Sequence, residues 1–320
     1  MPAISPRNSL LGIVSAVAAA VFFSLNDVSI KFLSGDYALY QVVLIRSLIG
    51  ILFLIAVIVP LEGGLKSLRT RNLGKHLLRG TFVVFANMTF FLGLAAMPLA
   101  DAVAIFFVSP LIVTAFSVIF LREHVGAHRW AAVAVGLAGV LVMLRPGGGA
   151  FQPASLLPVA AAFGYAGLHM MTRRMGGTES AGAMTFYIQL LFIVVSLAMG
   201  LVFGDGRFGV PGNAPLDFLL RAWVWPAPGD LPIFALIGIG SALGGYFISQ
   251  AYRLAEAGLA APFEYVAMPM AIFWGLAVFG EWPDGVAWIG IALIVGGGLY
   301  MLWREIRHGR RLASETPARR

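Results

Sequence analysis

Four ionisable side chains lie inside apolar stretches of the sequence that are long enough to cross a bilayer. Asp27 and Lys31 belong to the first stretch, Arg46 to the second and Glu264 to the ninth. A charge near the centre of a membrane span costs roughly 3 kcal/mol or more, so such residues usually face a partner, a water-filled cavity or a transported molecule. These four residues are therefore the first candidates for chemistry.

Each candidate also has a structural alternative. Asp27 and Lys31, four residues apart, can pair on one helix face, or Lys31 can extend to the outer interface. The planar guanidinium of Arg46 suits a substrate carboxylate or phosphate, and a structural ion pair with Asp27 or Asp101 is its alternative. A buried Glu264 could carry a proton at neutral pH or bind a cationic substrate group. At the cytoplasmic mouth of its span, Glu264 would only be solvated.

Polar and aromatic side chains deep in the apolar stretches complete the set. Aromatic rings can stack on planar molecules, whereas some polar groups only hydrogen-bond one helix to another. A lone histidine such as His169 can likewise be structural. The predicted cavity residues are Asn26, Asp27, Arg46, Asn87, Tyr165, His169, Tyr187, Gln189, Tyr246, Gln250, Glu264, Tyr265 and Trp274.

The elements that must position these residues are membrane helices. Of the 320 residues, 59% are hydrophobic and only 12% are charged, against about 25% charged in an average globular protein. The sequence divides into ten apolar runs of about the length that crosses the hydrocarbon core. We therefore predict an all-α polytopic membrane protein with ten transmembrane helices.

The distribution of Lys and Arg predicts the orientation of these spans. When the spans alternate from a cytoplasmic N-terminus, 17 Lys and Arg residues fall on the inner side and 3 on the outer side. Positive residues favour the cytoplasm, so we expect an inner-membrane protein with both termini cytoplasmic, residues 1–9 as a short N-terminus and 305–320 as a basic tail. Membrane insertion then explains the net charge of +7, and nucleic acid is not a predicted partner.

The second half of the sequence repeats the first. Pro110 and Pro269, 159 residues apart, each stand within an apolar run that closes on a glutamate, and the two glutamates, Glu123 and Glu281, are 158 residues apart. Self-similarity over half a chain indicates an internal duplication. The two prolines can act as hinges or as fixed kinks in the helix packing.

The duplication predicts two five-helix repeats, at residues 10–146 and 153–304, with a longer extracytoplasmic loop at 204–230 in the second. Because five is an odd number, two consecutive repeats enter the membrane from opposite sides. Such inverted repeats are typical of secondary transporters, whose substrate site lies near the bilayer midplane.

An apolar–Pro–apolar–Glu run followed by a Gly-rich last span, present in each half, resembles the EamA family of the drug/metabolite transporter superfamily. Residues 102–144 and 261–302 carry this likeness, which extends over almost the whole chain. The resemblance implies a basket of helices around a central cavity. It also implies alternating-access transport of a small polar or amphipathic metabolite, such as an amino acid, a nucleoside-like compound or a vitamin. Stretches 26–31 and 41–46 are similar to members that import flavin- or adenosylmethionine-type metabolites.

The alternatives to a secondary transporter are a membrane-embedded enzyme, a lipid-handling protein and a passive channel. The sequence shows no nucleotide-binding loop in the right context and no nucleophile constellation, and Glu123, His124 and His128 are interpreted as a solvated loop. We therefore expect no enzymatic activity, cofactor or metal, and a monomer or weak homodimer whose partners are its substrate and the bilayer. Proton coupling through Glu264 is a further hypothesis.

Overall fold

The computed structural model describes residues 6–121, 127–145, 152–175, 179–254 and 264–315. These residues form helices and connecting turns, and no strand occurs among them. The α-helices are α1 (Pro6–Leu33), α2 (Leu39–Phe53), α3 (Val59–Leu61), α4 (Leu73–Leu94), α5 (Leu99–Phe106), α6 (Ser109–Leu121), α7 (Ala127–Leu144), α8 (Leu156–Met175), α9 (Ala181–Phe203), α10 (Ala214–Leu220), α11 (Leu231–Leu254), α13 (Ala267–Phe279) and α14 (Gly285–Glu315). A π-helical turn at Leu54–Ile58 joins α2 to α3, and short 3₁₀ turns lie at Leu65–Leu68, Pro153–Ser155 and Pro228–Asp230.

Helices of membrane-spanning length dominate the fold. Backbone groups in hydrocarbon must be satisfied within the segment, which favours helices wherever the sequence is continuously apolar. Six helical segments are long and apolar enough to cross a membrane, namely Leu10–Leu33, Leu39–Leu61, Leu73–Leu94, Pro153–Thr172, Ala181–Phe203 and Pro228–Ala251. Shorter apolar helices cover Leu99–Val113, Trp130–Leu144, Ala267–Phe279 and Gly285–Tyr300. The chain is a multi-pass membrane protein.

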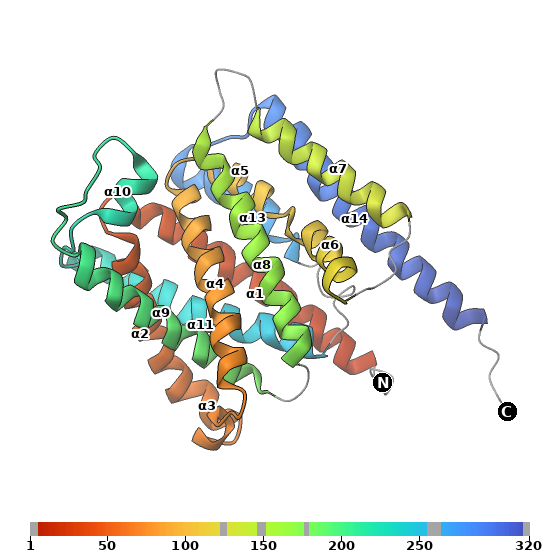
Figure 1. Cartoon of the computed structure of the whole chain (residues 1–320), viewed down its shortest axis with the longest axis horizontal. Coiled ribbons are helices and arrows are strands. Elements are labelled where there is room, and N and C mark those ends of the chain that lie inside the picture. Colours follow the sequence, from red (N-terminus) through yellow and green to blue (C-terminus); the bar gives the residue numbers. More distant parts are fainter. Residues whose placement is uncertain (1–5, 122–126, 146–151, 176–178, 255–263, 316–320) are drawn as a thin grey trace.

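The two halves of the chain interleave rather than form separate bundles. Helix α1 packs on α11, α4 packs on α8, and α2 packs on α9. Helices α7 and α14 lie side by side along one edge of the molecule (Figure 1). Each of these contacts joins a helix of the first half to a helix of the second, so any space at the centre has walls from both halves.

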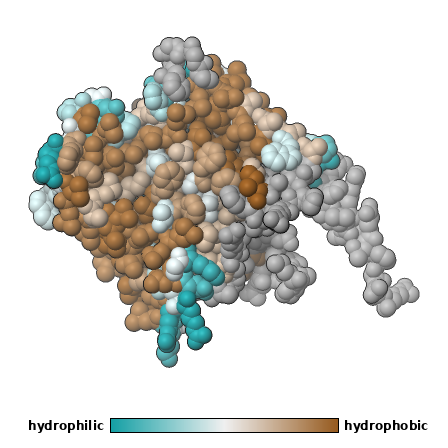
Figure 2. Space-filling model, viewed as in Figure 1, coloured by the Kyte–Doolittle hydropathy of each residue, from teal (hydrophilic) through white to brown (hydrophobic). Residues whose placement is uncertain are grey.

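The outer surface is largely apolar. Figure 2 shows hydrophobic residues over most of the visible face, with hydrophilic residues gathered near α10 and beyond α3. Large side chains such as Leu201, Leu52, Ile119 and Phe273 are 88%, 65%, 64% and 59% exposed. A soluble monomer rarely exposes so much contiguous apolar surface, whereas lipid is a suitable solvent for it.

Both prolines of the repeated motif lie in the first turn of a helix. The run predicted at residues 102–121 is interrupted after Phe106, and Pro110 is the second residue of α6. Pro269 is the third residue of α13. A proline in the first turn sacrifices no intrahelical hydrogen bond, because the N–H there has no partner inside the helix. The prolines therefore begin helices and do not bend them in the middle.

Glycines bring the helices of the two halves close together around α2. A Cβ atom on Gly238 of α11 would lie 3.1 Å from the carbonyl oxygen of Arg46 on α2. A Cβ atom on Gly50 of α2 would lie 2.7 Å from Nε2 of Gln189 on α9. Only glycine at these positions lets α2, α9 and α11 approach so closely.

The contact between α7 and α14 also depends on glycines. A Cβ atom on Gly139 of α7 would lie 3.0 Å from the carbonyl oxygen of Gly290 on α14, and also 2.8 Å from Cγ1 of Ile294. A Cβ atom on Gly290 would lie 3.1 Å from the carbonyl oxygen of Gly139. The two backbones are thus in direct contact.

An ion pair joins the end of α1 to the end of α13. The ammonium of Lys31 donates to Oε1 and Oε2 of Glu281 at 2.7 and 2.9 Å and to the carbonyl oxygen of Met97 at 2.6 Å. The predicted pairing of Lys31 with Asp27 is therefore wrong, because the closer carboxylate comes from 250 residues further along the chain. The Lys31 side chain is only 10% exposed, so it does not extend into water.

At the same end of the molecule, the segment after α9 is tied to the start of α2. Tyr37 donates to Oδ2 of Asp230 at 2.6 Å, which raises the pKa of the Tyr37 phenol. Gln41 exchanges two hydrogen bonds with the backbone of Val224. The predicted loop at 204–230 thus packs against the start of α2, and it contains α10.

At the opposite end of α2, Glu179 ties the α8–α9 connection to the segment before α4. Its carboxylate accepts from Oγ1 of Thr70 at 2.9 Å and Nδ2 of Asn72 at 3.2 Å, and it lies 3.2 Å from Nε2 of His76. Burial opposes ionisation of Glu179, but these neighbours together hold the pKa of its carboxyl below the usual value.

Candidate functional site

A cavity of about 170 Å³ lies among helices of both halves. The first half contributes α1, α2, α4 and α5, and the second half contributes α8, α9, α11 and the start of α13. Aromatic side chains form much of its wall, namely Phe23, Phe90, Phe91, Phe106, Phe107, Tyr165 and Phe192. Mostly apolar walls with a few converging polar groups are typical of small-molecule sites.

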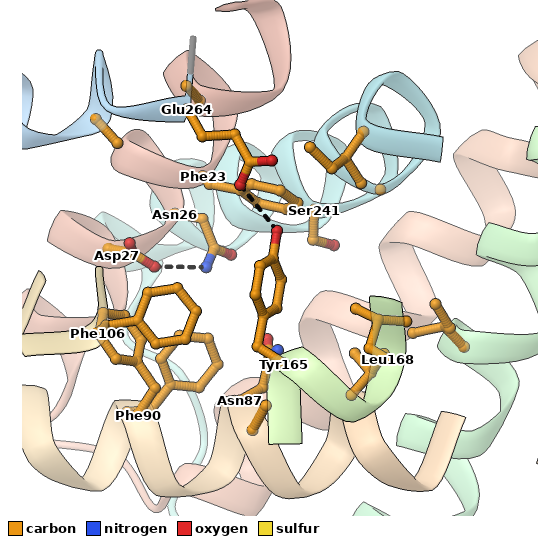
Figure 3. A pocket seen from close by; sticks show the side chains of 18 of the residues that line it. Phe23, Asn26, Asp27, Asn87, Phe90, Phe106, Tyr165, Leu168, Ser241 and Glu264 are labelled. Carbon is orange, nitrogen blue, oxygen red and sulfur yellow. Dashed lines mark hydrogen bonds between the residues drawn. The ribbon is translucent and has the colours of Figure 1, made fainter. Parts of the chain in front are cut away.

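Seven of the thirteen predicted site residues line this cavity, and Figure 3 shows several of them from close by. They come from five helices, α1, α2, α4, α8 and α9, and from the segment that precedes α13. The seven are Asn26, Asp27, Arg46, Asn87, Tyr165, Gln189 and Glu264.

The other six predicted residues lie outside the described lining of the cavity. The His169 ring packs edge-on against Tyr165, with the ring centroids 4.4 Å apart. Tyr187 donates to the carbonyl oxygen of Leu68 at 2.9 Å, near the end of the helices. These two residues therefore lie behind the lining or away from it.

The remaining four pack within or between helices. Gln250 donates to the Tyr246 hydroxyl at 3.0 Å on the same helix. Tyr265 is buried, with its ring centroid 4.9 Å from that of Phe107, and Trp274 packs against its neighbour on α13. A substrate contact by any of these four remains a prediction.

Arg46 is a buried cation at the wall of the cavity. It is 2% exposed, and its guanidinium carbon lies 4.7 Å from the ring centroid of Phe192 and 5.5 Å from that of Phe91. Cation–π contacts of this kind stabilise a desolvated guanidinium. Asp27 interacts with Arg46 electrostatically, but no described carboxylate lies within 4 Å of the guanidinium.

Glu264 meets Tyr165 across the cavity. The Tyr165 hydroxyl donates to Oε2 of Glu264 at 3.0 Å, and both side chains are visible in Figure 3. Glu264 precedes the turn formed by Tyr265 and Val266, after which α13 begins at Ala267. The carboxylate therefore lines the cavity beside the turn that leads into α13.

Arg79 is a site residue that the sequence reasoning missed, because it was counted among the cytoplasmic basic residues. It is 3% exposed and lines the cavity from α4. Its Nε donates to Oγ1 of Thr172 at 2.9 Å and its Nη1 donates to the carbonyl oxygen of Met184 at 3.3 Å. The available signal was its place inside the third apolar run, which separates it from the basic loop that precedes it.

Comparisons with known proteins agree with this architecture. The sequence profile of the EamA-like transporter family matches residues 10–145 and again residues 152–303. The chain is 29% identical to a riboflavin transporter of Rhizobium johnstonii, with 97% of each chain covered. It is 30% identical to a riboflavin transporter of Vibrio cholerae, with 95% of this chain and 97% of that one covered.

Two further similarities are more distant. An S-adenosylmethionine uptake transporter of Rickettsia prowazekii is 25% identical, with 93% of this chain and 95% of that one covered. A solved crystal structure with 21% sequence identity superposes with a TM-score of 0.65 and covers 94% of this chain, which shows a shared fold.

The chain belongs to the EamA-like transporter family. It is a membrane transporter of a small metabolite and not an enzyme. The prediction of family and general function from the sequence is confirmed.

Proposed function

We propose that this chain is a secondary transporter that carries a planar, uncharged, vitamin-like metabolite of the riboflavin class by alternating access. The observation that supports this most directly is the cavity, in which seven aromatic rings surround a few buried hydrogen-bonding groups. A flavin has a flat ring system that can stack on aromatic faces and polar groups along its edge and side chain. Two relatives named as riboflavin transporters, aligned along nearly their whole length, support the same substrate class.

The balance of charge in the cavity favours an uncharged substrate. Two carboxylates, Asp27 and Glu264, face two guanidinium groups, Arg46 and Arg79, in the same lining. A cationic S-adenosylmethionine-like substrate is the second candidate, because a relative carries that name and the two carboxylates could bind its positive groups. With the two arginines present, these carboxylates provide no net negative charge for a cation.

The packing of the helices supports ten spans in two inverted repeats. The α1–α11 contact has a counterpart in the α8–α4 contact when the halves are exchanged, and α2–α9 and α7–α14 each pair a helix with its own counterpart. The family profile also matches each half separately. Such repeats provide two equivalent conformations, one open to each side of the membrane. We place both termini in the cytoplasm and the protein in the inner membrane, and we assign bending to the helix starts at Pro110 and Pro269.

Uptake into proteoliposomes tests the substrate. Purified protein is reconstituted, and uptake of radiolabelled riboflavin and of radiolabelled S-adenosylmethionine is followed against protein-free vesicles. We expect saturable riboflavin uptake that excess unlabelled riboflavin suppresses. Uptake of S-adenosylmethionine without riboflavin would overturn the substrate class, and uptake of neither would overturn both candidates.

A second measurement tests proton coupling through Glu264. If Glu264 carries the coupled proton, Glu264→Gln abolishes uptake that is driven by a pH gradient but retains exchange of labelled for unlabelled substrate across the membrane. Full retention of pH-driven uptake by this variant would show that the coupling lies elsewhere. Tyr165→Phe removes the 3.0 Å hydrogen bond to Glu264 and is expected to change the pH dependence without abolishing exchange.

A further inference from the structure

Three buried polar atoms in the lining of the cavity have no hydrogen-bond partner among the residues that the structure describes. They are Nε of Arg46, Oε1 of Gln189 and Oδ1 of Asn26. The three residues are only 2%, 3% and 4% exposed, and all three line the cavity. Buried polar groups in native proteins are almost always paired, so three unpaired atoms around one cavity indicate the hydrogen-bonding pattern of what binds there.

Arg46 and Gln189 are neighbours across the α2–α9 contact. The guanidinium of Arg46 lies over the ring of Phe192, one turn beyond Gln189 on α9. Gly50, one turn beyond Arg46 on α2, is the glycine whose missing Cβ leaves room for the Gln189 amide. A donor from α2 and an acceptor from α9 are thus presented from the same part of the wall.

The orientation of the Gln189 amide is set by its surroundings. Its Nε2 lies 3.0 Å from Oγ of Ser241, and that hydroxyl donates its own proton to the carbonyl oxygen of Gly238 at 3.1 Å. The Ser241 oxygen must therefore accept from Gln189, which places the NH₂ group on the Ser241 side. The free atom of Gln189 is consequently its oxygen, an acceptor.

The orientation of the Asn26 amide on α1 is likewise set by a neighbouring side chain. Its Nδ2 points to Oδ1 of Asp27 at 3.5 Å, an orientation visible in Figure 3, and its oxygen is left as a second acceptor. The three unpaired atoms therefore offer one guanidinium donor and two amide acceptors to a bound molecule.

We propose that Arg46 and Gln189 together recognise an imide edge of the substrate, in which a ring carbonyl stands beside a ring N–H. Arg46 donates to the carbonyl oxygen, and Oε1 of Gln189 accepts from the N–H. The two phenylalanine rings around the guanidinium hold the donor in place. This assignment rests on the proposed flavin substrate, whose pyrimidinedione ring carries such an edge, and it makes Arg46 and Gln189 specificity-determining residues.

Methylation of the imide nitrogen tests the assignment directly. Uptake of riboflavin and of N3-methylriboflavin is compared in proteoliposomes of the wild-type protein. Loss of one neutral hydrogen bond corresponds to roughly a 3- to 10-fold change in affinity, and we expect a rise in KM of that size for the methylated flavin. Equal KM values would overturn the proposal, whatever the variants below show.

Variants then test which residue produces the preference for riboflavin over N3-methylriboflavin. Gln189→Leu removes the acceptor and is expected to raise KM for riboflavin roughly 3- to 10-fold while abolishing the preference over N3-methylriboflavin. Ser196→Ala is the matched control, because Ser196 lies two turns further along α9, is fully buried with an unpartnered hydroxyl, and does not belong to the described lining. Its preference should equal that of the wild type.

Arg46→Lys completes the set, because both flavins keep the carbonyl that Arg46 is assigned to contact. It should raise KM for both flavins by the same factor and leave the preference intact. A preference that persists in Gln189→Leu, or one that disappears in Ser196→Ala, would overturn the assignment to Gln189. Absence of riboflavin uptake by the wild-type protein would instead overturn the proposed substrate, so the two failures are distinguishable.

Discussion

Replacement of Lys31 by methionine should destabilise the protein more than loss of any exposed ion pair. The Lys31 ammonium makes three contacts of 2.6 to 2.9 Å, to Glu281 and to the carbonyl oxygen of Met97. Oε2 of Glu281 also accepts from the backbone N–H of Leu99 at 2.9 Å. Lys31→Met keeps an unbranched side chain of similar length but removes the charge and all three hydrogen bonds.

The expected magnitude follows from the exposure of the two partners. Removing one member of a fully buried pair costs about 3–5 kcal/mol. The Lys31 side chain is 10% exposed, but that of Glu281 is 28% exposed, so water and the Leu99 N–H partly compensate for the lost ammonium. We therefore expect Lys31→Met to lower the free energy of unfolding by about 2–3 kcal/mol.

A second ion pair at the same end of the molecule provides the control. Arg145 and Asp284 are 2.5 Å apart, but their side chains are 33% and 56% exposed. Exposed pairs contribute about 0–1 kcal/mol, so Arg145→Met should have a small effect. The two variants remove one positive charge each and differ mainly in burial.

Unfolding of the detergent-solubilised protein by titration with SDS, followed by tryptophan fluorescence, measures both effects. The single variants Lys31→Met and Glu281→Gln and the double variant Lys31→Met/Glu281→Gln together form a double-mutant cycle with the wild type. We expect a coupling free energy of at least about 1 kcal/mol between Lys31 and Glu281. A coupling below about 0.5 kcal/mol, or an effect of Lys31→Met no larger than that of Arg145→Met, would refute the reasoning.

Three further perturbations have effects of defined sign. Gly139→Ala should lower the free energy of unfolding by about 1–3 kcal/mol because its Cβ would meet the α14 backbone. Gly296→Ala is the control and should not lower the free energy of unfolding, because no atom lies within 4 Å of a Cβ at that position. Because the folded-state pKa of Glu179 is depressed, its stabilisation is present above its ordinary pKa and is lost as the pH falls through the folded value. The wild type should therefore lose more stability than Glu179→Gln when thermal unfolding is compared at neutral and acid pH. Gly280 caps α13 in the left-handed conformation, with φ of 67°, so Gly280→Val should lower the thermal unfolding temperature. Gly285 does not have a positive φ, so Gly285→Val should lower that temperature less.

The class of the protein could be predicted because it depends on overall composition and on the lengths of the apolar runs, and not on particular contacts. Continuous apolar runs leave helices as the only conformation that satisfies the backbone in hydrocarbon. The described parts of the predicted runs are largely helical, although the run at 102–121 is divided into α5 and α6. Residues such as Asp27, Arg46 and Gln189 were identified for the same reason, because a polar group at that depth is costly without a purpose. All three line the cavity.

The partners of these residues could not be predicted, because they depend on contacts across the whole fold. Lys31 binds Glu281, which is 250 residues away, whereas the sequence offered the nearer Asp27. Arg79 was counted with the basic residues of the loop before α4, although it lies inside α4 and lines the cavity. The phenylalanines of the lining had no signal of their own, since a ring in a membrane helix is equally suited to lipid, core or cavity.

Arg46 and Gln189 are 143 residues apart, as are Lys31 and Arg174, and they are matching positions in the first part of the two proposed repeats. In an assembly of two identical halves, both positions would carry the same side chain, and the wall would present the same kind of group twice. Because both proposed repeats are encoded in one chain, position 46 can supply a guanidinium while position 189 supplies an amide oxygen. A molecule with unlike groups on adjacent atoms can then be held in a single orientation.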